Sequence, residues 1–182
     1  MPDVFYLHPK DGLDANEGTK DKPWQTMRKV KNTVGAGDVV NILGGTYTQD
    51  QIEPGAGVPA WTEQHAHGTA GKPITIQANP GDTVIFEGQS KNFWTYVEPA
   101  NGTSPITDRY LLVQNLTFQN YGGAVIGVSH ANFVAVRNCR FLKSGTGGSA
   151  LGAWHATHVI FTNNVIQKTG THGIYMAEGS TF

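Results

Sequence analysis

The C-terminal part of the chain, residues 110–182, alternates apolar and polar positions in a phrase that occurs three times, at residues 111–118, 134–141 and 159–166. Alternation with a period of 2 indicates β-strands that turn one face towards a core. A repeat of roughly 24 residues leaves room for about three short strands and is typical of a solenoid, in which each strand lies beside its equivalent in the next coil. We therefore predict an all-β chain that forms a parallel β-helix.

A second apolar phrase lies between these runs, at residues 124–128, 149–153 and 173–177. In this alignment one apolar set is Ile126, Leu151 and Tyr175, and the other is Val125, Ala150 and Ile174. The face that each set occupies stays open. If Ile174 and Met176 point inward, Tyr175 is exposed and His130 and His155 stack outside; otherwise the surface carries Ser129, Trp154 and Glu178.

An asparagine occurs at the same place in each copy of the first phrase: Asn115, Asn138 and Asn163. Side-chain amides stacked at one bend of successive coils can bond to one another and satisfy buried polar groups. We expect a structural ladder of buried amides here rather than a ligand site.

Apolar and polar residues alternate less regularly in the N-terminal half of the chain. Residues 4–7, 38–43, 73–77 and 83–87 read as strands, and residues 23–34 read as the one helix of the chain. Met27, Val30 and Val34 give that helix a single apolar stripe, which suits a cap over the open first coil. No comparable cap follows the last repeat.

These patterns divide one domain into three parts. Residues 1–47 hold the first strand, the capping helix and the first coil; residues 48–109 hold early coils interrupted by two long loops; and residues 110–182 hold the three repeats. Because the chain stops while still repeating, we expect a truncated protein with an uncapped C-terminal end, or an end that another molecule covers. Self-association through that end is one such possibility.

Composition excludes several functions. A formal net charge of -1 with 15% charged residues lacks the basic face that nucleic acid requires. No apolar run reaches the roughly 20 residues of a membrane span. The lone Cys139 occupies an apolar repeat position and reads as a packed thiol. The N-terminus lacks a secretory pattern, so the chain is either cytoplasmic or without its leader; we favour a secreted or cell-surface protein.

Four short motifs carry a resemblance: Asp14-Ala-Asn16 with Gly18-Thr19, Pro23-Trp-Gln-Thr26, Gly37-Asp-Val-Val40 and Gly44-Gly-Thr-Tyr47. They resemble the N-terminal signature of right-handed parallel β-helix proteins of the pectate-lyase-like superfamily, many of which are secreted polysaccharide lyases and glycosidases. The resemblance implies a right-handed, single-stranded β-helix that acts on or binds an extended polysaccharide. A non-catalytic glycan-binding or self-associating scaffold is the alternative.

The resemblance also implies β-elimination as one reaction, in which a cation neutralises a uronate carboxylate and a base removes the neighbouring proton. No catalytic residue of the family falls on a matching position. The residues themselves suggest acid–base candidates at His130, His155 and Glu178. Candidate substrate-binding residues are aromatic or polar side chains of the repeats and of the first loop: Trp154, Tyr175, His172, Trp61, Glu63, His65 and His67.

Calcium is the one cofactor that the sequence suggests. Asp11, Asp14 and Asn16 have alternating oxygen spacing, but no closing bidentate glutamate follows, and a local turn is the preferred interpretation. We assign no metal ligands.

Overall fold

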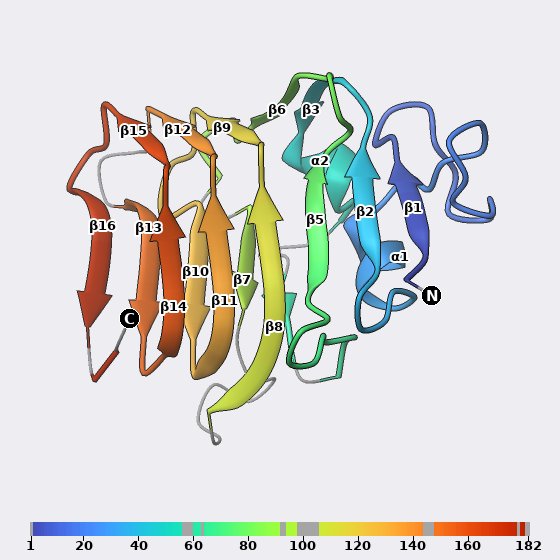
Figure 1. Ribbon diagram of the computed structural model, residues 1–182. Coiled ribbons are helices and arrows are strands. Elements are labelled where there is room, and N and C mark those ends of the chain that lie inside the picture. The colour runs from blue at the N-terminus through green and yellow to red at the C-terminus, as the bar shows by residue number, and fades with distance from the viewer. Residues whose placement is uncertain are drawn as a thin grey trace.

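A computed structural model describes residues 2–55, 60–62, 64–91, 94–97, 106–143, 148–177 and 179–180. The chain winds into a solenoid whose three sheets are parallel throughout (Figure 1). Sheet A contains β1 (Val4–Leu7), β2 (Val39–Ile42), β5 (Ile74–Ala78), β8 (Thr107–Gln114), β11 (Ala131–Arg137) and β14 (Thr157–Thr162). Sheet B contains β3 (Gly45–Thr48), β6 (Val84–Glu87), β9 (Thr117–Gln119), β12 (Arg140–Leu142) and β15 (Val165–Gln167). Sheet C contains β4 (Ala60–Trp61), β7 (Thr95–Val97), β10 (Ile126–Ser129), β13 (Ser149–Trp154) and β16 (His172–Ala177).

The first repeated phrase has the register that the sequence predicts. Val134 pairs with Leu111 on one side and with Val159 on the other. Stacking of like residues also builds the core under sheet B, where the aromatic rings of successive coils lie over one another. Their centroids are 6.2 Å apart for Tyr47 and Phe86, 5.5 Å for Phe86 and Phe118, and 5.1 Å for Phe118 and Phe141.

The predicted alignment of the second phrase is wrong by one residue in its last copy. Leu151 pairs with Ile126 and with Ile174, so Tyr175 lies opposite Gly152 instead of belonging to the Ile126 set. The register of β16 depends on the connection that follows β15, and residue types alone did not reveal it. Met176 packs against the core and Tyr175 is exposed, as in the first of the two arrangements considered. Trp154, which the second arrangement places at the surface, is partly exposed as well.

The predicted ladder of buried asparagine amides is also wrong. Asn115, Asn138 and Asn163 are all exposed, and their φ angles are 60°, 53° and 53°. Asparagine tolerates this left-handed conformation better than most residues, so it supplies the bend between sheets A and B. The inward hydrogen bonds come from Asn164, whose Oδ1 accepts from the Cys139 amide and whose Nδ2 donates to the Val136 carbonyl.

The helix is shorter than predicted. α1 spans Met27–Lys31, and the Thr26 hydroxyl caps it by accepting from the Lys29 amide. Residues before Thr26 cannot be helical because Trp24 forms a bridge with Leu7. The predicted stripe of Met27, Val30 and Val34 is nevertheless buried in the core.

A second helix, α2 (Gln49–Ile52), was not expected from the sequence. It begins directly after β3, and the Gln51 side chain accepts a hydrogen bond from the Thr48 amide, which satisfies a donor at the helix start. Neither α1 nor α2 has the length and apolar character to cross a membrane, and the same holds for every helix in the described ranges.

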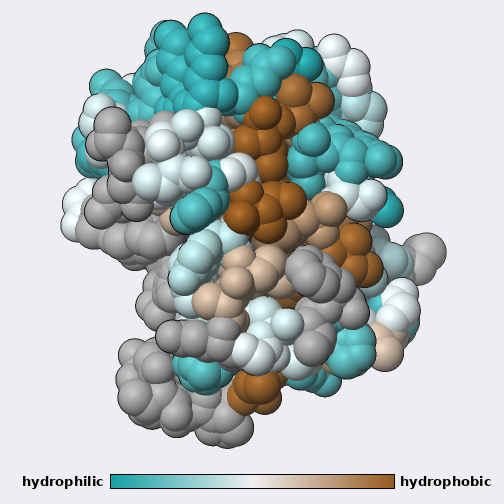
Figure 2. Space-filling model, turned by 90° about the vertical axis from the view of Figure 1, so that its left-hand side faces the viewer, coloured by the Kyte–Doolittle hydropathy of each residue, from teal (hydrophilic) through white to brown (hydrophobic). Residues whose placement is uncertain are grey.

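The last described coil exposes apolar side chains. Figure 2 views the molecule from this end and shows a band of hydrophobic residues across it. Val165 on β15 and Ile174 on β16 are 39% and 46% exposed, and Ile160 on β14 is 53% exposed. β14, β15 and β16 are each the terminal strand of their sheet within the described residues.

Candidate functional site

The outer face of sheet C carries a cluster of aromatic rings, which we call the aromatic platform: Trp154, Tyr175 and His172. Trp154 ends β13, and its indole lies over Gly152, where an added Cβ would meet the ring at 2.3 Å. Tyr175 extends outward from the neighbouring strand, with its ring centroid 5.9 Å from that of Trp154. His172 stacks on Tyr175 at 5.5 Å. The three predicted residues are therefore brought together, and their combined surface can cover the apolar face of a sugar ring.

Two imidazole rings lie next to Trp154 in the chain, because His155 follows it directly and the ring of His130 lies beside that of His155. His130 and His155 directly follow β10 and β13, and their ring centroids are 4.6 Å apart. Both have left-handed backbones, with φ angles of 48° and 44°. This bend lets consecutive residues Trp154 and His155 both reach the surface. The Ser129 hydroxyl lies 2.9 Å from Nδ1 of His130 and orients that ring.

The first loop contributes less than predicted. Trp61 is only 2% exposed, and its indole nitrogen donates to the Ala66 carbonyl at 2.6 Å, so it is a core residue and cannot contact a polymer. His65 accepts from the Thr62 amide through Nδ1 at 2.9 Å. Burial, followed by the charge of Lys31, lowers the pKa of His65, so its neutral form fastens the loop. The predicted Glu63 and Glu178 lie outside the described residues.

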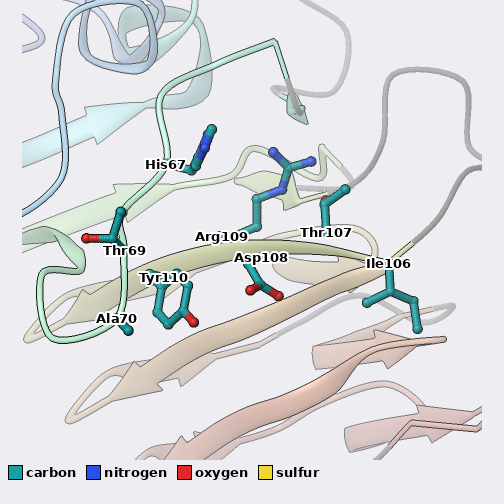
Figure 3. Close-up of a pocket in the computed structure, with 9 residues that line it drawn as sticks. His67, Thr69, Ala70, Ile106, Thr107, Asp108, Arg109 and Tyr110 are labelled. Atoms are coloured by element: carbon teal, nitrogen blue, oxygen red, sulfur yellow. The ribbon is translucent and has the colours of Figure 1, made fainter.

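His67 is exposed and lines a pocket of about 550 Å³ together with the start of β8. β8 contains one residue more than β11 between Asp108 and Leu111, and the register shifts there. Such a bulge re-aims a side chain. Arg109 is turned inward and is 2% exposed, and Figure 3 shows it on the side of β8 that faces His67, with Asp108 on the opposite side. Arg109 could not be identified from the sequence, because an alternating pattern does not reveal a one-residue insertion.

The described residues bring no cluster of charged or sulfur-containing metal ligands together. They contain no group of three or more histidine, cysteine, aspartate or glutamate side chains that could hold an ion. In the loop considered for calcium, Asp14 accepts from the Gln25 and Thr26 amides through Oδ1 and from the Thr26 hydroxyl through Oδ2. Asn16 donates to the Pro23 carbonyl. These hydrogen bonds tie the loop to residues 23–26, and calcium binding there stays a prediction.

Two curated proteins are similar in sequence. The chain is 30% identical over 129 residues to the uncharacterized protein YwoF of Bacillus subtilis, covering 69% of this chain and 25% of that protein. It is 32% identical over 85 residues to the pectate lyase PEL9 of Emericella nidulans, covering 47% of this chain and 18% of that enzyme. The chain thus spans a quarter or less of the length of these relatives.

Solved structures share the fold. A rhamnogalacturonan lyase superposes with a TM-score of 0.58 at 21% identity, covering 99% of this chain and 51% of that one. Pectate lyase Pel9A gives a TM-score of 0.52 at 19% identity, with 86% of this chain and 39% of that one covered. The chain thus shares its fold with these two structures. Because the family model described as Pel9A-like, right handed beta helix region matches residues 5–179, the chain belongs to that family of right-handed β-helices.

Proposed function

We propose that this chain binds an extended polysaccharide along the outer face of sheet C, as part of a protein that acts on that polymer. The observation that carries the proposal is the aromatic platform, in which Trp154 is held over Gly152 beside Tyr175. Equivalent side chains of neighbouring coils are about 4.8 Å apart, so the rows on this face run along the solenoid axis. A linear polymer laid along that axis meets one row after another.

An acidic polysaccharide is the preferred ligand class. Three similar proteins are named as a pectate lyase, a rhamnogalacturonan lyase and a lyase specific for mannuronic acid. At the aromatic platform, the exposed imidazoles of His155 and His172 can donate hydrogen bonds to a uronate carboxylate. With a net charge of -1, recognition has to come from such local groups. This proposal also places the protein outside the cell or at its surface, where such polymers occur.

Trp154→Ala is expected to weaken polysaccharide binding about tenfold or more, because burial of a large aromatic face contributes roughly 1.5–3 kcal/mol. Gly152→Ala should have a similar effect without removing the indole, since its Cβ would displace the ring. Gly173→Ala is the matched control, because its Cβ would meet Ile166 at an ordinary 3.5 Å. Isothermal titration with polygalacturonate, rhamnogalacturonan and alginate measures the affinities. Equal binding by all four proteins would contradict the proposal.

The neighbouring histidines His130 and His155 favour β-elimination as a second candidate function. His155 is exposed beside the platform, and its partner ring lies 4.6 Å away. In this reaction an imidazole nitrogen takes the proton from the carbon next to the uronate carboxylate. The electrons form a carbon–carbon double bond, the bond to the glycosidic oxygen breaks, and that oxygen leaves as a hydroxyl after gaining a proton. Retention of binding without reaction would instead favour a glycan-binding scaffold.

If His155 is the base, the protein should release an unsaturated, ultraviolet-absorbing uronide from one of the three polymers, and His155→Ala should reduce the rate at least about 100-fold. His158→Ala serves as the control, because that exposed histidine lies on sheet A. The assay follows absorbance over time at saturating polymer. Absence of the product from every polyuronate, or an unchanged rate for His155→Ala, would eliminate this role.

A further inference from the structure

The outer face of sheet A carries a groove of about 490 Å³ that the proposed polysaccharide site does not use. Its floor is formed by Leu112, Ala135 and Ile160, which pair in register on β8, β11 and β14. Ile160 is 53% exposed. The outer face of a sheet that meets water usually carries polar side chains, so an apolar row across three coils requires an explanation.

One wall of the groove is a column of stacked rings. The centroids of Tyr110 and Phe133 are 4.4 Å apart with an interplanar angle of 3°, and those of Phe133 and His158 are 4.6 Å apart. All three residues have left-handed backbones, with φ angles of 45°, 56° and 54°. Bulky residues rarely adopt this conformation, and strain of this kind concentrates at functional sites.

The left-handed backbone alone does not explain why aromatic residues occupy these positions. The neighbouring bend of each coil has the same left-handed conformation and uses Asn115, Asn138 and Asn163, which adopt it at lower cost. We therefore attribute the rings of Tyr110, Phe133 and His158 to the contacts that these side chains make. Stacking on one another is part of that, and the edges that line the groove are available to a ligand.

The wall opposite the ring column ends at the positively charged side chain of Arg137. The side chains of Asn41, Gln77, Gln114 and Arg137 form a hydrogen-bonded row across four strands. Gln114 Oε1 accepts from Nε of Arg137 at 2.7 Å, which orients the guanidinium at the edge of the groove. Its titratable lining groups within the described residues are Tyr110, Arg137 and His158, and none of these is acidic. The groove therefore combines an apolar, ring-lined body with one site for an anion.

We propose that this groove binds an aromatic carboxylic acid, with its ring on the floor of Leu112, Ala135 and Ile160 and its carboxylate on Arg137. A polysaccharide fits less well, because most of its hydroxyl groups would face apolar side chains without hydrogen-bond partners. A purely apolar ligand would leave the oriented guanidinium unused. A planar acid uses both features, since a guanidinium binds a carboxylate through two parallel hydrogen bonds.

The test uses trans-cinnamate and the neutral cinnamamide as probes, titrated into the 182-residue chain and followed by NMR. Cinnamate should bind saturably, and cinnamamide at least about tenfold more weakly, because a charged hydrogen-bond pair is lost. Arg137→Gln should weaken cinnamate by a similar factor, whereas Arg140→Gln, an exposed cation on sheet B, should not. Equal affinity for the two probes, or no saturable binding of cinnamate, would overturn the proposal.

Phe133→Asn separates the contribution of this ring to binding from its contribution to stability. Asparagine tolerates the left-handed backbone of this position, so the variant should unfold at an unchanged or higher temperature while binding cinnamate several-fold more weakly. Unchanged cinnamate binding in this variant would count against the groove. If cinnamate does not bind but oligogalacturonate binds in a way that depends on Phe133, the groove is a sugar site instead. The result is independent of the sheet C site, because Trp154→Ala leaves this face intact.

Discussion

Phe118→Ala is expected to lower the free energy of unfolding by about 3–5 kcal/mol, the usual cost of truncating a fully buried aromatic residue. The Phe118 side chain is 0% exposed. Its ring lies 5.5 Å from Phe86, 5.1 Å from Phe141 and 5.0 Å from Trp94. Removing it opens a cavity between coils on both sides, and neighbouring rings fixed by their own strands cannot collapse into it.

Urea unfolding followed by circular dichroism measures this loss. Tyr175→Ala is the control, because Tyr175 is 39% exposed on the terminal strand and its removal should cost less than about 1 kcal/mol. A loss below about 1 kcal/mol for Phe118→Ala would mean that the stacked rings do not hold successive coils together.

Lys31→Met is the second change with a large expected effect, a loss of about 3–5 kcal/mol, because it leaves Glu53 as a buried charge without its ammonium partner. The side chains of Lys31 and Glu53 are 6% and 3% exposed, with Nζ and Oε2 3.5 Å apart. Arg28 contacts the other oxygen of Glu53 at 3.2 Å but is itself more than half exposed. The double variant Lys31→Met with Glu53→Leu should recover most of the loss.

The exposed pair Lys22 and Glu17 provides the matched control. Their side chains are 62% and 65% exposed at a separation of 3.3 Å, so Lys22→Met should cost less than about 1 kcal/mol. Equal losses for Lys22→Met and Lys31→Met would contradict this account of the buried pair.

The pH dependence has a defined sign. Burial lowers the pKa of Lys31 below its ordinary value, although Glu53 opposes this effect. Between the folded and unfolded pKa values the unfolded chain binds more protons at Lys31. Stability of the wild type relative to Lys31→Met therefore rises with pH in that window, which ends near pH 10.5.

Much of the fold could be predicted because a solenoid repeats its own pattern. Alternating residues in three copies determined the pairing of Leu111, Val134 and Val159. Bends and connections were harder, because they depend on backbone conformation rather than on hydrophobicity. The asparagines proved to be exposed bend residues, and the connection before β16 shifted Tyr175 by one position.

The candidate site was predicted in part. The shared repeat position of His130 and His155 predicted that their rings would lie side by side, and Trp154, Tyr175 and His172 also converge. Their roles in binding or catalysis stay predictions. Trp61 was misassigned because an isolated tryptophan in a polar loop gives no sign of its burial, and Arg109 was missed because its inward orientation comes from a bulge.

The central claim is that a polysaccharide lies on the outer face of sheet C, and NMR titration of the wild-type protein with oligogalacturonate tests it most directly. The account predicts that the largest amide shifts occur at Gly152, Trp154 and Tyr175, with saturation at one common affinity. Shifts confined to sheet A residues such as Leu112 and Ala135, or no shifts with any acidic oligosaccharide, would contradict it.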